Sequence, residues 1–189
     1  MTDSVTPRPE TRVVVLLGSL RADSLNRRIA ERLRAEAPAG VVVEIAEHLP
    51  ELPFYNEELD GAALPEPARA LREQVAGADR VLAITPEYNG TMPAVLNNAI
   101  DWLSRPFGAG ALRGKPFAVV GATPTRFGGK WSHDDTRRSA GVAGAAVVND
   151  LVLSHSTLEG GELDDPAVFE RFVQALTALV EHEAGSAAA

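Results

Sequence analysis

The chain has 189 residues, of which 45% are hydrophobic, so it can bury one sizeable core as a single domain. It contains no cysteine, which excludes disulfides, thiolate nucleophiles and cysteine-based metal sites. The formal net charge of −8 argues against a general nucleic-acid binder, because such a protein needs a basic surface. No apolar run approaches the roughly 20 residues that span a bilayer. Residues 1–11 are polar and lack the apolar run of a secretory signal, so we expect a disordered tail there and a cytoplasmic protein.

Short aliphatic runs alternate with helical patterns along the chain. The aliphatic runs show no period-two alternation, which is typical of strands buried on both faces. We predict strands over residues 13–17, 41–46, 81–85, 117–122 and 147–153. Apolar residues at helical spacing predict helices over residues 24–37, 67–77, 93–103, 130–144 and 166–182. Residues 47–64 form a long polar and aromatic loop, and residues 184–189 a frayed tail.

Strands that alternate with helices form a parallel sheet covered by helices on both faces. We therefore predict an α/β fold over residues 12–183, a flavodoxin-like three-layer sandwich with a five-stranded parallel sheet of order 2-1-3-4-5. Sheets of this kind bind ligands beyond the carboxyl ends of their strands, where the strand order reverses. The loops after the first, third and fourth strands are therefore the candidate ligand-binding loops.

The loop after the first predicted strand surrounds a helix start with groups that bind phosphate. These are the hydroxyls of Ser19 and Ser24, the guanidinium of Arg21 and the amide of Asn26, after a glycine at position 18. Helix N-termini offer free N–H groups and a partial positive charge, and arginine adds a forked donor. The alternative is that Ser24 caps the helix and Arg21 is a solvated surface residue. Dinucleotide and P-loop glycine patterns are absent, which favours a mononucleotide.

The loop after the third predicted strand favours an unusual backbone path, because it contains Pro86, Asn89 and Gly90. Such a path can direct main-chain N–H and C=O groups at the polar edge of a planar heterocycle. Tyr88 can stack on the ring or form a wall beside it. The alternative is an ordinary β–α turn with a half-buried tyrosine.

Four segments together resemble the NADPH-dependent FMN reductase family, which includes quinone and chromate reductases and azoreductases. They are residues 18–26, 52–57, 86–90 and 97–106, in the family's order and spacing. The resemblance implies that FMN binds with its phosphate on the first loop and its ring along the second. Thr123, after the fourth strand, takes the place of a family serine near the ring. The implied cofactor-binding residues are Gly18, Ser19, Leu20, Arg21, Ser24, Leu25, Asn26, Pro86, Glu87, Tyr88, Asn89, Gly90 and Thr123.

The resemblance also implies an NAD(P)H-dependent oxidoreductase. A hydride would pass from NADPH or NADH to the flavin, and electrons would then pass to a quinone, chromate, an azo compound, a flavin or a similar small acceptor. Because the cofactor carries this chemistry, we expect no catalytic acid or base in the protein. A homodimer or homotetramer is expected too, since the loop with Phe54 and Tyr55 lies near a neighbouring subunit in the family. The donor preference, the acceptor and the oligomer are not fixed by the sequence.

The sequence departs from the family after the fourth strand. Thr125 stands where the family has a glycine, and Arg126 follows it. The next helix carries Trp131, Ser132 and His133 in place of the family's Arg-Ala-Gln. We expect FMN binding to survive these changes and the approach of the nicotinamide to be affected. One hypothesis is that Arg126 holds the 2′-phosphate of NADPH, and the alternative is that it faces solvent.

Two other classes of protein remain possible. A flavodoxin-type electron carrier would bind FMN but react poorly with NAD(P)H, and the arginine in the phosphate loop argues against it. A signalling receiver domain needs acidic residues after the first strand and an aspartate after the third, where this chain has Gly18-Ser19 and Pro86-Glu87.

Other polar clusters carry weaker signals. Residues 132–135 indicate a polar helix start, since adjacency in sequence is not the geometry of a catalytic triad. The four histidines share no ligand spacing, so no metal site is expected. We expect Trp102 to pack in the core or at a subunit contact, and the carboxylates of the long loop to be solvated.

Overall fold

The structure, a computed structural model, describes residues 10–158 and 163–183. The predicted N-terminal tail lies outside this part except for Glu10 and Thr11, and Thr11 already begins the first strand. The predicted tail over residues 184–189 lies outside it entirely. The strands are β1 (Thr11–Leu17), β2 (Val41–Ile45), β3 (Arg80–Ile84), β4 (Pro116–Thr123) and β5 (Ala146–Ser156). The helices are α1 (Leu25–Ala35), α2 (Glu66–Ala76), α3 (Ala94–Leu103), α4 (Lys130–Val142) and α5 (Pro166–Glu181), with short 3₁₀ turns η1 (Leu49–Glu51) and η2 (Glu57–Leu59).

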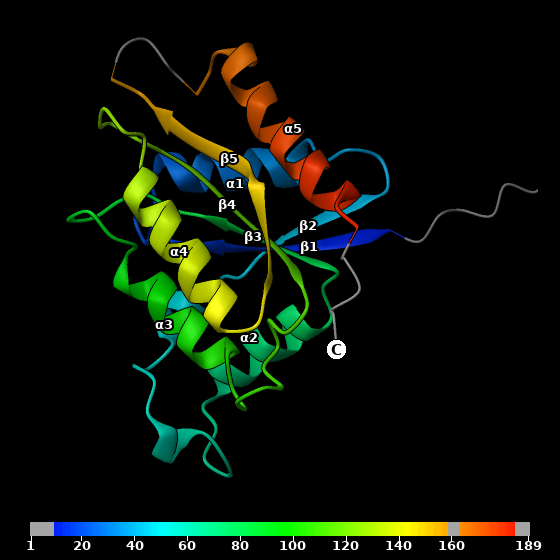
Figure 1. Ribbon diagram of the computed structural model, residues 1–189, viewed down its shortest axis with the longest axis vertical. Helices are drawn as coiled ribbons and strands as arrows, with labels where there is room; N and C mark the ends of the chain where they lie inside the picture. Colours follow the sequence, from blue (N-terminus) through cyan, green and yellow to red (C-terminus); the bar gives the residue numbers. More distant parts are fainter. Residues whose placement is uncertain (1–9, 159–162, 184–189) are drawn as a thin grey trace, which may run out of the picture.

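The five strands form one parallel sheet of order β2-β1-β3-β4-β5, which confirms the predicted fold. Helices cover both faces of the sheet and complete a three-layer sandwich (Figure 1). The helices α1 and α5 pack on one face, and α2, α3 and α4 pack on the other. The strand order reverses between β1 and β3, so the predicted ligand edge is the one where the loops after β1, β3 and β4 meet.

Two hydrophobic clusters, one on each face of the sheet, explain why the strands lack alternation in sequence. Val13, Val15 and Leu17 of β1 point toward α1 and α5. Val14 and Leu16 of the same strand point toward α2 and α3. Because both faces are covered, every residue in the centre of such a strand is apolar.

The strand β5 is longer than the sequence predicts. It continues to Ser156, because residues 154–156 pair in register with residues 121–123 of β4. The added residues are Ser154, His155 and Ser156. Because their side chains are polar, they do not belong to the aliphatic run that predicts the strand. The extension carries a serine hydroxyl to the carboxyl edge of the sheet.

The long loop after β2 is tied to the body of the protein. Asp60 accepts two hydrogen bonds from the guanidinium of Arg72, at 2.7 and 2.9 Å, and both side chains are largely buried. These hydrogen bonds hold the pKa of Asp60 below its usual value. The prediction that the loop's carboxylates are all solvated is therefore wrong for Asp60. Trp102 is fully buried, as predicted, and its indole N–H donates to Pro53 O at 2.8 Å.

Within the described residues, no helix has both the length and the apolar character needed to cross a membrane.

Candidate active site

Three loops meet at the carboxyl edge of the sheet, on the left of Figure 1. They are residues 18–24 after β1, residues 85–93 after β3 and residues 124–129 after β4. Gly18 allows the first two to approach, because a Cβ at this position would lie 2.2 Å from Thr85 Oγ1. The loops after β1 and β3 therefore form adjoining walls of one site.

The loop after β1 presents a cluster of hydrogen-bond donors at the start of α1. Ser24 caps this helix, since its Oγ accepts a hydrogen bond from Asn26 N at 3.2 Å. Within the described chain, the backbone N–H groups of residues 19–23 donate to no other group, and neither do the hydroxyl of Ser19 and the guanidinium of Arg21. Free donors at a helix N-terminus bind phosphate or another tetrahedral anion.

The side chain of Asn26 bonds to the main chain of β4. Its Nδ2 donates to Ala122 O and its Oδ1 accepts from Ala122 N, both at 2.9 Å. Ala122 lies beyond the last residue of β4 that pairs with β3, and the carboxamide bonds to its main-chain N–H and C=O. The side chain of Asn26 is therefore bound to the sheet. Leu25 likewise turns its side chain toward the core between α1 and α5. The backbone N–H of Leu25 donates to no group in the described chain and can still meet a ligand, whereas that of Asn26 already donates to Ser24 Oγ.

The loop after β3 makes a tight turn with its own hydrogen bonds. Tyr88 and Thr91 exchange two main-chain hydrogen bonds of 3.1 Å, and Asn89 and Gly90 between them have φ of 52° and 75°. Both values lie in the left-handed region, which asparagine and glycine tolerate best. The N–H groups of residues 87, 89 and 90 donate to nothing in the described part of the chain. The turn thus offers several donors beside the half-exposed Tyr88 ring.

A cavity of about 400 Å³ lies between these two loops. Its lining includes Gly18, Leu20, Arg21 and Tyr88. A larger hollow of about 660 Å³ lies at the far ends of α3 and α4. The smaller one marks the site, because parallel sheets bind ligands at their carboxyl edge and the free donors are there.

The side chain of Glu87 caps α4. This helix begins after Gly129, which has φ of 92° and no side chain to cap it. Glu87 Oε2 instead accepts from Trp131 N at 3.0 Å and from Ser132 N at 3.3 Å. A carboxylate is favourable there, because a helix N-terminus carries partial positive charge. The backbone N–H of Glu87, which donates to no group in the described chain, can still meet a ligand.

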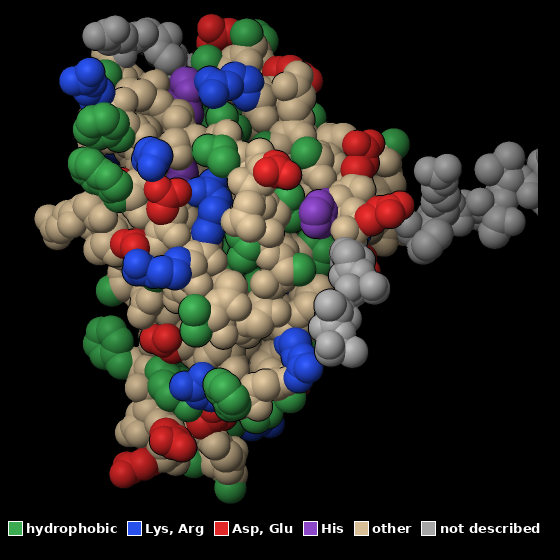
Figure 2. Space-filling view, in the orientation of Figure 1, with side chains coloured by type: hydrophobic (Ala, Val, Ile, Leu, Met, Phe, Trp, Pro, Cys, Tyr) green, Lys and Arg blue, Asp and Glu red, His purple; other side chains and the backbone are tan. Residues whose placement is uncertain are grey.

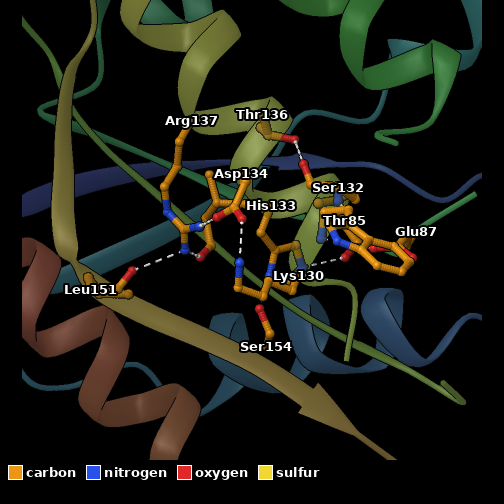
Figure 3. A network of polar contacts seen from close by, with 12 residues as sticks. Thr85, Glu87, Lys130, Ser132, His133, Asp134, Thr136, Arg137, Leu151 and Ser154 are labelled. Atoms are coloured by element: carbon orange, nitrogen blue, oxygen red, sulfur yellow. Dashed lines mark hydrogen bonds and ion pairs between the residues drawn. The ribbon is translucent and has the colours of Figure 1, made fainter. Parts of the chain in front are cut away.

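His133 lies in the first turn of α4, at the predicted helix start, but it is buried and not solvent-facing (Figure 3). Its Nε2 donates to Thr85 O at 3.1 Å, and its Nδ1 accepts from Ser154 Oγ at 2.6 Å. Burial lowers the pKa of His133 from 6.5 to about 4, so the imidazole is neutral near pH 7. The glycine within β4 is the one sequence feature that relates to this burial. A Cβ at Gly121 would lie 2.8 Å from His133 Nε2, so the glycine leaves space for the imidazole.

The loop after β4 adds aromatic and cationic side chains to the same edge. Phe127 and Trp131 are half-exposed, with ring centroids 5.1 Å apart, and the Arg126 guanidinium carbon lies 5.7 Å from the Phe127 centroid. Arg126 forms no ion pair with the described residues. Thr123 is buried and shares a 2.7 Å hydrogen bond with Thr125. Figure 2 shows hydrophobic, Lys and Arg side chains together along this edge.

Comparison with known proteins identifies the family. The family model of NADPH-dependent FMN reductases matches residues 11–158. A quinone reductase of Pseudomonas putida is 42% identical over 127 residues, which are 67% of this chain and 68% of that protein. A quinone reductase of Escherichia coli is 33% identical over 176 residues, 89% of this chain and 93% of that protein.

Solved structures agree with these matches. The flavoenzyme NAD(P)H:(acceptor) oxidoreductase FerB from Paracoccus denitrificans superposes with a TM-score of 0.81 at 30% identity, over 90% of this chain and 96% of that one. A flavodoxin from Pseudomonas aeruginosa, at 20% identity and a TM-score of 0.52, shares the fold. The enzyme matches favour a reductase over an electron carrier or a receiver domain. The chain belongs to the NADPH-dependent FMN reductase family and is an NAD(P)H-dependent, FMN-containing oxidoreductase.

Proposed function

We propose that FMN binds at the carboxyl edge of the sheet and that the physiological acceptor of its electrons is a quinone. One observation carries the placement of FMN: the loop before α1 leaves the N–H groups of residues 19–23, the Ser19 hydroxyl and the Arg21 guanidinium without partners in the described chain. These donors suit one phosphate group, held by charge-assisted hydrogen bonds.

The remaining polar groups of the site suit a flavin ring. The free N–H groups of residues 87, 89 and 90 can donate to oxygens and nitrogens along its edge. Tyr88 is 46% exposed beside them, and Leu20 across the cavity is 55% exposed, so both can pack against the ring. Bound FMN supplies the redox chemistry by accepting a hydride and releasing electrons, while the protein binds and orients it.

A quinone is the acceptor class that the relatives support. The proteins from Pseudomonas putida and Escherichia coli are quinone reductases, and a relative from a Burkholderia species is a 2-hydroxy-1,4-benzoquinone reductase, 43% identical over 112 residues. In this chain the exposed rings of Phe127 and Trp131 provide an apolar surface beside the site. A planar, uncharged acceptor can pack against such a surface.

The enzyme would act as a homodimer or a homotetramer in the cytoplasm. Phe54 is 82% exposed in the loop after β2, and a second subunit would remove this ring from water. A chain without cysteine has no need of an oxidising compartment. Sedimentation equilibrium at micromolar concentration tests the assembly, and a monomer would contradict it. Cell fractionation tests the location, and a membrane or secreted fraction would contradict it.

The cofactor and the acceptor are tested on the purified protein. Chromatography of the flavin released by denaturation should give FMN, and FAD as the sole flavin would contradict the single phosphate site. NADPH oxidation should then accelerate on addition of 1,4-benzoquinone. Equal rates with and without the quinone would exclude it as the acceptor and leave the binding of FMN standing.

A further inference from the structure

The first turn of α4 is bonded directly to the loop that would carry the flavin ring (Figure 3). Two of its backbone N–H groups, from Trp131 and Ser132, donate to the carboxylate of Glu87. The Ser132 hydroxyl then donates to Pro86 O at 2.8 Å, and it is completely buried. The start of the helix and the loop therefore hold each other by side-chain and main-chain hydrogen bonds.

His133 extends these contacts across the sheet. Its imidazole bonds to Thr85 O, the first main-chain acceptor of the loop, and Ser154 of β5 bonds to the other side of the ring. It passes over β4 at Gly121, where a Cβ would lie 2.1 Å from Thr85 O. One side chain thus connects the strands on either side of β4 at the base of the site.

The carbonyl groups held by α4 determine where the loop's donors point. In a trans peptide the C=O and N–H groups point in opposite directions. Because Pro86 O is turned toward Ser132, the N–H of Glu87 is turned to the opposite, open side of the loop. A shift of Thr85 or Pro86 would move this N–H, and the turn with Tyr88 that follows it, by a similar amount.

We propose that the first turn of α4 sets the position of residues 85–93, the flavin-ring loop, and that His133 is the residue that positions this loop. This inference rests on the proposed binding of FMN for its effect on catalysis, but not for its effect on the loop. A neutral imidazole is suited to the task. Since a carbonyl only accepts, Nε2 carries the proton and Nδ1 accepts from Ser154, which fixes the tautomer.

The first test measures hydrogen exchange in the flavin-free, full-length protein. The variant His133→Leu loses the bond to Thr85 O, so the amides of Tyr88 and Thr91 should exchange about tenfold faster. His133→Gln keeps an amide donor and should restore most of the protection. Ala140→Gly is the control, because it weakens the same helix at a buried position away from the loop.

Equal exchange at these two amides in His133→Leu and Ala140→Gly would overturn the inference, since His133 would then only stabilise the helix. If His133→Leu does not fold, Ser132→Ala removes the neighbouring bond to Pro86 O and is expected to give the same acceleration. Protection unchanged in Ser132→Ala would also count against the inference.

The second test measures reduction of the flavin-loaded protein by NADPH in a stopped-flow instrument. His133→Leu should lower the limiting rate by about tenfold to a hundredfold, because small misplacements of reacting groups are costly. The apparent dissociation constant for NADPH in the same experiment should stay unchanged, and His133→Gln should recover the limiting rate. A wild-type rate in His133→Leu would overturn the inference alone, whereas a wild-type protein that binds no FMN would overturn the proposed function and leave the exchange result decisive.

Discussion

The carboxamide of Asn26 and the main chain of Ala122 form a reciprocal pair of hydrogen bonds, each 2.9 Å long. This pair joins the helix behind the predicted phosphate loop to β4, the strand that leads to the aromatic and cationic loop. It also takes up the polar groups of the Asn26 side chain, so these are not free to bind a phosphate. The cationic side chain within residues 18–24 is that of Arg21.

Replacing Arg21 with alanine should weaken FMN binding without unfolding the protein. A charge-assisted contact with phosphate contributes about 1.5 to 3 kcal/mol, so the dissociation constant should rise about tenfold to a hundredfold. Fluorescence titration of the flavin-free protein with FMN measures it. Arg28→Ala is the matched control, because Arg28 lies in α1, directly after the loop, and pairs with Asp164. An unchanged constant in Arg21→Ala would show that Arg21 points to solvent.

The variant Glu87→Ala should lower the free energy of unfolding by about 1 kcal/mol, the usual effect of losing a helix cap. The reason is that Gly129 cannot cap α4 itself. Urea denaturation followed by circular dichroism measures the change, and Glu87→Gln, which keeps an acceptor oxygen, should recover much of it. A stability equal to that of the control Glu170→Ala, on the surface of α5, would contradict a capping role.

Acid should destabilise the protein through His133. The pKa of this residue is 6.5 in the unfolded chain and about 4 in the folded one, because burial disfavours the charged imidazole. Between these values the unfolded chain binds the extra proton, so stability falls as the pH falls from 6.5 to 4 and loses no more below that through this residue. The full loss is about 3 kcal/mol.

Urea midpoints between pH 7 and pH 4 should therefore fall more steeply for the wild type than for His133→Gln, which has no titrating ring. Asp134 and Arg137, the charged neighbours of His133, stay in both proteins and cancel in this comparison. Parallel pH profiles for the two proteins would mean that the pKa of His133 is the same in the folded and the unfolded chain.

Arg126 should select the phosphorylated donor. Its guanidinium is exposed beside the site and makes no ion pair with the described residues, so it is free to hold the 2′-phosphate of NADPH. The variant Arg126→Ala should raise the Michaelis constant for NADPH several-fold and leave that for NADH nearly unchanged. Arg138→Ala, another exposed arginine, serves as the control. Equal effects on both donors would mean that Arg126 shapes the loop and reads no phosphate.

Aliphatic runs and helical spacing were enough to predict the five strands and the five α-helices of the described residues, because burial on both faces leaves a clear pattern in sequence. The strand order was predicted from the flavodoxin-like fold that this alternation favours. The same search missed the end of β5, where Ser154 and His155 pair with β4 as regular strand residues. The last three residues of β5 are polar, so hydrophobicity gives no signal for them.

The phosphate loop could be located from its residue types, but the division of work within the site could not. Glu87 and Asn26 are predicted to contact the cofactor, yet their side chains bond to α4 and β4. His133 lies at the predicted start of a helix, but its burial and its bond to Thr85 O leave no signal in the sequence. The hydrogen-bond partners of these side chains lie far away in sequence. A sequence motif gives the type of a residue but not its partner, so these contacts could not be predicted.

Anaerobic titration of the purified, flavin-loaded protein with NADPH tests the central claim most directly. The visible absorbance of the oxidised flavin should bleach as the donor is added, and 1,4-benzoquinone should restore it. That result is expected of a reductase with donor and acceptor sites at one flavin. A bound flavin that stays oxidised in excess NADPH and NADH would contradict the account and would indicate an electron carrier.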